Sequence, residues 1–106
     1  MTEVEQFFDG LAARFKPERA EGMRAVYQFD VTGAQGGQWH ADIPGDGTCT
    51  VAKGVADAPT VTLRATDENL LKLVSGRLNP QMAFMTGKLK VKGDIGQANK
   101  LSSLFL

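Results

Sequence analysis

The amino-acid sequence predicts a two-layer α+β fold, in which a five-stranded, mostly antiparallel sheet has all of its helices packed on one face. Five short segments alternate apolar and polar residues, a pattern typical of strands with one buried face. None of the five is the continuous apolar run expected of a strand buried on both faces. Apolar residues at helical spacing occur at the start of the chain and again after about residue 66.

Residues 2–16 predict one amphipathic helix. Thr2 and Glu5 have the spacing of a capping box, in which each side chain accepts a hydrogen bond from the backbone of the other. Pro17 disfavours a helical conformation in the residue before it and so ends the segment. The apolar side chains fall on one stripe, which should pack on the sheet: Val4, Phe7, Phe8, Leu11 and Phe15.

Four alternating segments follow, at residues 24–32, 38–43, 48–51 and 60–66. Glycine-rich loops separate the first three, so these strands should pair antiparallel as hairpins. Gln28 and His40 fall on the outer face of the sheet by the same alternation. The apolar positions, which should face the helices, are Ala25, Tyr27, Phe29, Val31, Trp39, Ala41, Ile43, Cys49, Val51, Val61, Leu63 and Ala65.

The last forty residues predict three helices and one more strand. Thr66 is a suitable N-cap for a helix with an apolar face at Leu70, Leu71, Leu73 and Val74, and Gly76 is placed to follow its end. Asn79-Pro80 then begins a short helix that carries Met82, Phe84 and Met85. In residues 88–92, Leu89 and Val91 alternate with three lysines, which predicts the fifth strand. A last apolar helix should cover residues 95–105.

Length and composition exclude several classes of protein. A chain of 106 residues fits one domain, so we expect residues 1–106 to share a single core. Twelve basic and twelve acidic residues cancel, which argues against nucleic-acid binding. One cysteine and one histidine allow neither an internal disulfide nor a structural zinc site, and we expect no cofactor. The acidic N-terminus and the lack of a long apolar run predict a soluble, cytoplasmic protein.

The C-terminal part carries a resemblance to a known family. Its residues are Ser75-Gly76-Arg77-Leu78-Asn79-Pro80, Ala83-Phe84, the run Gly87-Lys88-Leu89-Lys90-Val91-Lys92-Gly93-Asp94, and Ala98, Lys100, Leu101 and Leu104-Phe105. This pattern resembles the sterol carrier protein 2 (SCP2) family of sterol-binding, or non-specific lipid-transfer, domains. The aromatic first helix, the three-strand meander and Trp39 in its second strand fit the same family.

The resemblance implies a sheet and helices that enclose an apolar tunnel for fatty acids, fatty acyl-CoA, sterols or phospholipids, with no covalent chemistry. Peroxisomal members of the family end in a Ser-Lys-Leu-like tripeptide, whereas this chain ends Leu104-Phe105-Leu106, so we expect a cytoplasmic location. A monomer that touches membranes transiently is also expected. In members fused to enzymes the domain presents lipids to its partner, and that accessory role is an alternative here.

A lipid site needs more inward apolar surface than the protein fills by packing on itself. Methionine suits such a site because its unbranched side chain packs around ligands of different shapes. Burying an alkyl chain gains roughly 0.8 kcal/mol per methylene, so broad tolerance of chain length is expected. The predicted ligand-binding residues are Phe7, Phe8, Leu11, Phe15, Phe29, Trp39, Leu71, Val74, Met82, Phe84, Met85, Leu101, Leu104 and Phe105. The same residues would also build a solid core, as in a protein-interaction module.

The polar residues favour a carrier over an enzyme. The inward positions of the sheet include no carboxylate and no histidine, and only Tyr27 and Cys49 could titrate there. His40 should point away from Cys49, which disfavours a nucleophilic pair. We therefore predict no catalytic residues. Separately, we predict that the last helix, from about Ile95 to Phe105, gates the tunnel. Candidates for contact with a lipid headgroup are Arg14, Arg19, Arg24, Gln28, Arg77, Gln81 and Lys88.

Overall fold

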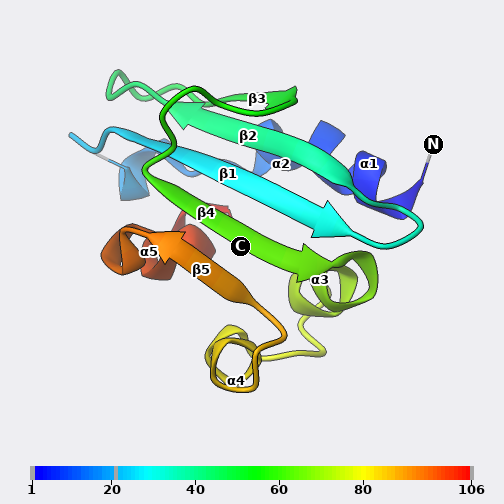
Figure 1. Ribbon diagram of the computed structural model, residues 1–106. Coiled ribbons are helices and arrows are strands. Elements are labelled where there is room, and N and C mark those ends of the chain that lie inside the picture. The colour runs from blue at the N-terminus through cyan, green and yellow to red at the C-terminus, as the bar shows by residue number, and fades with distance from the viewer. Residues whose placement is uncertain (1, 21, 106) are drawn as a thin grey trace.

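The computed structural model describes residues 2–20 and 22–105, so Met1, Glu21 and Leu106, the last residue of the C-terminal tripeptide, lie outside it. Its sheet has five strands, as the alternation predicted (Figure 1). They are β1 (Ala25–Thr32), β2 (Gly37–Ile43), β3 (Thr50–Lys53), β4 (Val61–Thr66) and β5 (Lys90–Gly93). Their order across the sheet is β3-β2-β1-β4-β5.

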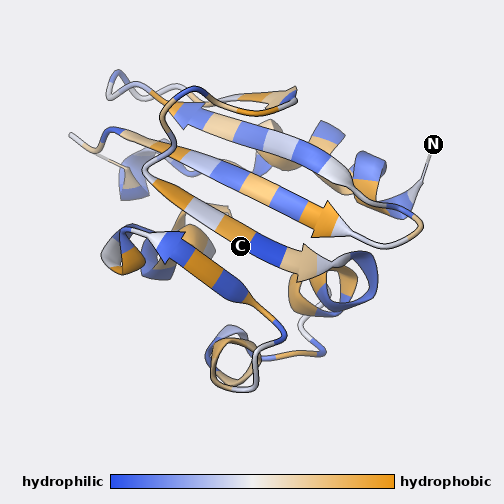
Figure 2. Ribbon diagram, viewed as in Figure 1, coloured by the Kyte–Doolittle hydropathy of each residue, from blue (hydrophilic) through white to orange (hydrophobic). Residues whose placement is uncertain are grey.

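Three of the four strand pairs are antiparallel, and β1 pairs with β4 in parallel. The mostly antiparallel sheet of the prediction is therefore confirmed. The register aligns apolar residues on the inner face: Phe29 of β1 lies beside Trp39 of β2 and Leu63 of β4, and Leu63 lies beside Val91 of β5. Figure 2 shows the resulting bands of polar and apolar residues along the strands.

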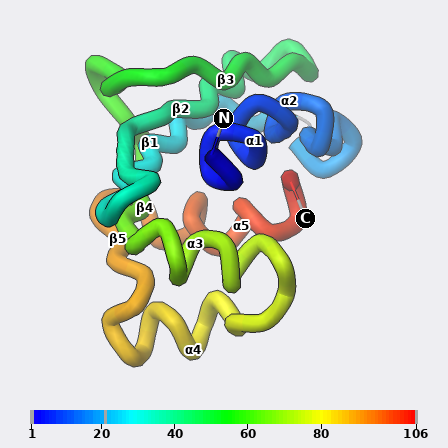
Figure 3. The backbone as a smooth tube through the Cα atoms, turned by 90° about the vertical axis from the view of Figure 1, so that its right-hand side faces the viewer, coloured from blue at the N-terminus to red at the C-terminus, as the bar shows by residue number. Residues whose placement is uncertain are grey.

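The helices all lie on one side of the sheet (Figure 3). They are α1 (Glu3–Asp9), α2 (Leu11–Arg14), the 3-10 turn η1 (Pro17–Arg19), α3 (Asp67–Val74), α4 (Pro80–Met85) and α5 (Ile95–Phe105). Of the helices described, none is both long enough and apolar enough to cross a bilayer.

The single helix expected over residues 2–16 is wrong, because Gly10 divides it. The predicted capping box is present: the Glu5 backbone N–H donates to Thr2 Oγ1 and the Thr2 N–H to Glu5 Oε1, both at 3.1 Å. Gly10 then ends α1, and Phe15 is already extended, at φ −60° and ψ 132°. A glycine loses more backbone entropy in a helix than any other residue, so the break falls there.

The third strand begins later than the alternation indicated. Its turn continues to Thr48, whose backbone N–H donates to Asp46 Oδ1 at 3.1 Å. An aspartate that bonds the backbone two residues on favours a turn over a strand, so β3 starts at Thr50 and leaves Cys49 outside it. Val51 still lies beside Ala41 on the inner face.

Aromatic rings pack half of the inner face solidly. Phe8 of α1 stacks on Trp39 with ring centroids 4.4 Å apart, and Phe29 lies 5.3 Å from Phe8. At the other end of the helical layer, Phe105 lies 5.7 Å from Phe15 and 6.5 Å from Tyr27. These contacts fix α1 over the strands β1 and β2, and the end of α5 over β1.

Gln28 lies on the outer face, but it is only 3% exposed. Its Nε2 donates to the carbonyls of Trp39 (3.2 Å) and Gly54 (3.3 Å), and its Oε1 accepts from the Ala56 N–H at 2.8 Å. The side chain therefore ties the β3–β4 connection to the back of the sheet. Its amide is used on the face away from the helices, as the alternation indicated, and this candidate for a headgroup contact does not line the cavity described below.

The β1–β2 hairpin joins two helices to the sheet. The Val4 N–H at the start of α1 donates to Gln35 Oε1 at 3.1 Å, and the Gln35 N–H donates to Asp67 Oδ2 at 2.9 Å. Gly33 has φ +104°, and a Cβ at this position would meet Asp67 Oδ1 at 2.5 Å. Glycine is required here both by the backbone conformation and by the close approach of the carboxylate.

Replacing Gly33 with alanine should destabilise the fold by about 1–3 kcal/mol, because it adds a steric clash to a strained backbone. Gly47→Ala is the matched control: its φ is +86°, but nothing lies within 4 Å of the added Cβ. Urea denaturation of both variants measures the difference. If Gly33→Ala lost no more stability than Gly47→Ala, the close approach of the Asp67 carboxylate to Gly33 would have no measurable effect on the free energy of unfolding.

Candidate functional site

A cavity of about 940 Å³ lies between the inner face of the sheet and the helices. Its walls come from β1, β4 and β5 on one side, and from α1–α5 on the other. No residue of β2 or β3 contributes to it. The inner face is thus packed over β2 and the start of β1, and hollow over the end of β1, β4 and β5.

Eight of the fourteen predicted ligand-binding residues line this cavity: Phe7, Leu11, Phe29, Val74, Phe84, Met85, Leu101 and Phe105. They come from six elements and are brought together by the fold alone. Phe7 and Leu11 mark the boundary between the packed half and the hollow half, since each also contacts the buried core or belongs to it.

The other six predicted residues lie outside the lining. Phe8 and Trp39 are buried against each other, and Leu104 is buried near the end of α5. Phe15 and Leu71 are half-buried and pack against the core. Met82 is 55% exposed on α4, on the solvent side of the short helix.

Sequence reasoning left out ten apolar lining residues. Alternation had placed some of them on the inner face, and helical spacing had placed Leu70 and Leu73 beside Val74. Neither pattern distinguishes a residue that meets another side chain from one that faces a void. The ten are Val31, Leu63, Ala65, Leu70, Leu73, Pro80, Leu89, Val91, Ile95 and Ala98.

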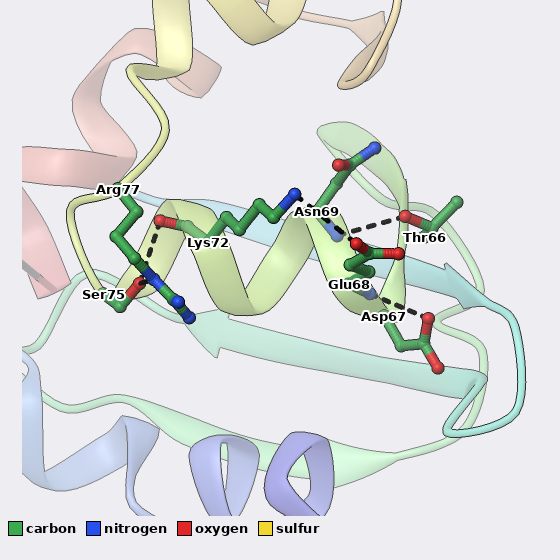
Figure 4. A network of polar contacts seen from close by, with 7 residues as sticks. All are labelled: Thr66, Asp67, Glu68, Asn69, Lys72, Ser75 and Arg77. Carbon is green, nitrogen blue, oxygen red and sulfur yellow. Dashed lines mark hydrogen bonds and ion pairs between the residues drawn. The ribbon is translucent and has the colours of Figure 1, made fainter.

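Helix α3 forms one wall, and its ends are held by local polar contacts (Figure 4). The Asn69 N–H donates to the N-cap Thr66 Oγ1 at 3.1 Å, and Lys72 Nζ lies 3.4 Å from Glu68 Oε1. Gly76, at φ +81°, follows the C-cap Ser75 as predicted. No residue of α3 is buried although its apolar face points inward, because that face borders the cavity and not a packed neighbour.

Helix α4 forms the outermost wall, beyond the β5 edge of the sheet (Figures 1 and 3). Asn79 Oδ1 caps it by accepting from the backbone N–H of Gln81 at 2.8 Å. Ala83 is fully buried and anchors the helix, and its carbonyl accepts from the Lys88 and Leu89 N–H groups at 2.8 and 3.0 Å.

The polar groups of the lining are few. Asn79, Gln81, Asn99 and Ser102 are neutral, and no lysine or arginine of the described chain lines the cavity. Asp30 also touches it, but its Oδ1 accepts from Gln38 Nε2 at 3.3 Å on the outer face. Of the predicted headgroup contacts, Gln81 lines the cavity, whereas Arg14, Arg19, Arg24, Arg77 and Lys88 do not.

Tyr27 and Cys49, the two titratable inward residues, both lie outside the lining. The Tyr27 hydroxyl is fully buried and donates to the Gln97 carbonyl at 2.8 Å; burial raises its pKa above the ordinary value. Burial, with a smaller effect of Asp42, raises the pKa of the Cys49 thiol to about 11. His40 lies on the outer face, with Nδ1 3.2 Å from the Gly54 carbonyl. These groups form no acid–base or nucleophilic pair at the cavity.

Comparisons with known proteins agree with this geometry. A model of the SCP-2 sterol transfer family matches residues 5–106. Hydroxysteroid dehydrogenase-like protein 2 of Rattus norvegicus is 38% identical over 101 residues, which cover 95% of this chain and 19% of that protein. The chain thus spans about a fifth of the length of this curated relative.

Solved structures show the same fold. The palmitated SCP2L2 protein of Aedes aegypti superposes with a TM-score of 0.79 at 27% identity, over 96% of this chain and 93% of that one. A sec-alkylsulfatase of Pseudomonas sp. superposes with a TM-score of 0.83 at 21% identity, over 98% of this chain but 16% of that enzyme. From the family match and the shared fold, the chain belongs to the SCP-2 sterol transfer family, a family of lipid-binding domains.

Proposed function

We propose that residues 1–106 act as one lipid-binding domain and that the cavity holds the apolar part of its ligand. The observation that carries this proposal is a cavity of about 940 Å³ whose lining is apolar apart from five residues. Its volume lies near the top of the range of roughly 300–1,000 Å³ found for small-molecule pockets. A void of this size in a small domain forfeits packing contacts that a bound acyl chain would restore.

Fatty acids, fatty acyl-CoA and sterol-like lipids are the ligand classes we infer. A structural neighbour from Aedes aegypti is described as palmitated, which supports an acyl chain. Because the described lining holds no cation, an anionic headgroup would gain nothing from entering it. We therefore place the headgroup at the rim, near Gln81 and Asn79, where it keeps its contact with water.

Ligand entry past α5 is the route we propose. Ile95, Ala98 and Leu101 of this helix line the cavity. The end of the helix is fixed, since Leu104 is buried and its carbonyl accepts from the Lys16 N–H at 2.8 Å. Its start is open, with Ile95 53% exposed. We therefore propose that the gate, predicted for the whole helix, lies at Ile95, before the hydrogen bond that the Tyr27 hydroxyl donates to the Gln97 carbonyl at 2.8 Å.

A non-catalytic role for this domain within a larger assembly is the second candidate. The matched relatives are named dehydrogenase-like and are four to five times as long, and a sulfatase contains the same fold. A carrier domain beside an active site would raise the local concentration of substrate. The monomeric state and the cytoplasmic location expected from the sequence stay predictions.

Palmitate, palmitoyl-CoA and cholesterol should each be tested for displacement of a fluorescent fatty acid from the delipidated protein. We expect saturable binding and competition by at least the two acyl ligands, because roughly 0.8 kcal/mol per buried methylene suffices for affinity without a specific polar contact. A solid-core interaction module would bind none of the three, and that result would overturn the proposal.

Filling the cavity should weaken binding without unfolding the protein. Ala98 lines the cavity and is half-buried, so Ala98→Trp places a ring in the ligand volume. Each two methylenes displaced should cost about tenfold in affinity in the same displacement assay. Ala13→Trp, on the exposed side of α2, is the control. Equal affinities for the two variants would show that the ligand lies elsewhere.

Alkylation of Cys49 tests the enzyme alternative. With a pKa near 11 the thiol is protonated at pH 7, so its reaction with iodoacetamide should be slow and rise about tenfold per pH unit towards pH 11. Mass spectrometry measures the rate, and the urea-unfolded protein supplies the reference. A rate that levels off below pH 8 would indicate an activated thiolate and would contradict a purely non-catalytic domain.

A further inference from the structure

We propose that the cavity selects lipids with an uncharged, hydroxyl-bearing headgroup, and that it binds a monoacylglycerol more tightly than a fatty acid of the same chain length. The inference rests on the proposed function and deepens it, because it names the headgroup that the same cavity prefers. Two features carry it: the place at which the cavity opens, and the chemistry of the side chains that border the opening.

The cavity opens between α4 and α5. Most of its lining residues are buried or half-buried, and the exposed ones all lie in two segments, residues 79–85 and 95–102. Within the described chain, no exposed lining residue comes from the sheet or from α1–α3. A lipid whose acyl chain fills the cavity would therefore place its headgroup between these two segments.

This opening has an apolar side and a polar side. The end of α4 and the start of α5 are connected through β5, and they contribute Phe84, Met85 and Ile95. The start of α4 and the later turns of α5 lie farther from the sheet (Figure 3). Apart from Pro80, the exposed lining residues there are all polar and uncharged. These four residues form the polar rim: Asn79, Gln81, Asn99 and Ser102.

The polar rim has hydrogen-bonding groups that the described part of the protein does not use. Asn79 Oδ1 caps α4, but its Nδ2 donates to no described residue. The side chains of Gln81, Asn99 and Ser102 make no hydrogen bond within the described residues. Asn99 and Ser102 are three positions apart, so they lie on the same face of α5. Amide and hydroxyl side chains both donate and accept, so the polar rim offers a ligand both kinds of group.

The polar rim includes no charged residue. Arg77 and Lys100, the charged residues nearest to it in the sequence, do not line the cavity, and Arg77 Nε donates to Ser75 Oγ at 3.0 Å. A carboxylate headgroup would lose contact with water there without a cation to offset the loss. It also only accepts hydrogen bonds, so the amide carbonyls of the rim would gain no partner from it. The hydroxyls of a monoacylglycerol donate and accept, and they carry no charge.

Competition between two lipids with the same acyl chain tests this selection. Monolauroylglycerol and laurate are each used to displace a fluorescent fatty acid from the delipidated full chain, at about 0.15 M salt so that distant charges are screened. We expect the monoacylglycerol to displace the probe at an at least tenfold lower concentration, which corresponds to about one or two net hydrogen bonds. An affinity for laurate equal to or above that for the monoacylglycerol would overturn the inference.

Two substitutions of Asn99 test the polar rim itself. Asn99→Lys adds a cation there, so it should raise the affinity for laurate relative to the monoacylglycerol by about tenfold. Asn99→Leu removes the amide at similar volume, so the preference for the monoacylglycerol should fall by about three- to tenfold. Ser103→Lys is the matched control, because Ser103 is an exposed residue of the same helix outside the cavity lining. It should leave the ratio of the two affinities unchanged.

Failure of this inference differs from failure of the proposed function. Both affinities are measured on the same variant, so partial unfolding lowers them alike and leaves their ratio unaffected. If neither lipid displaced the probe from the unaltered chain, the proposed function would fail, and this inference with it. If both displaced it at the same concentration, only the headgroup selection would be overturned. An equal change of the ratio in Asn99→Lys and Ser103→Lys, or no change in either, would also overturn it.

Discussion

The stacking of Phe8 on Trp39 is the contact on which the rest of the structure depends. Two rings 4.4 Å apart hold α1 at a fixed height above the sheet. Phe29 beside them and Phe105 on Tyr27 extend the same height along β1. The helical layer is thereby supported over one half of the inner face. Over β4 and β5 the helices border the cavity, and the space beneath them is left open.

Polar contacts keep the open half from collapsing. The hairpin residue Gln35 joins the start of α1 to Asp67 at the start of α3, so both helices are fixed to the same end of the sheet. The buried Tyr27 hydroxyl holds α5 through the Gln97 carbonyl. Buried polar groups lose much free energy if they are left without partners, so collapse of the helices into the cavity would break these hydrogen bonds at a cost. The hydrogen bonds at the border of the cavity therefore help to keep it open.

The sequence predicted most of the fold because strand and helix periods are local properties. Alternation placed all five strands and their faces, and the caps at Thr2, Thr66 and Asn79 formed as expected. The predictions failed where the apolar pattern indicated a helix or strand but a glycine or a turn interrupted it. Gly10 interrupted an otherwise regular apolar stripe, and the Asp46 turn delayed β3. Gln28 follows the alternation, but a connection from another part of the chain buries it.

The candidate site was predicted less completely, for a physical reason. Phe7 and Phe8 are neighbours on the same helical stripe, yet Phe7 borders the cavity and Phe8 lies in the solid core. Phe29 and Trp39 are partners in the same register, and again only the first reaches the void. Periodicity tells which face a side chain is on. Whether another side chain or the cavity lies opposite that face depends on the distance between the sheet and the helices. The stack of Phe8 on Trp39 sets that distance, and it joins parts of the chain that are far apart in the sequence.

The one parallel strand pair has a consequence for the order of folding. The β1–β2–β3 meander joins residues close in sequence, such as Phe29 and Trp39, whereas pairing β4 with β1 brings together Phe29 and Leu63, much farther apart. Closing the longer loop costs more chain entropy and is slower. The packed half of the sheet should therefore form first and open last, and the hollow half should be the part with the lowest local stability. The region that admits a ligand would then also be the region whose backbone amides exchange fastest.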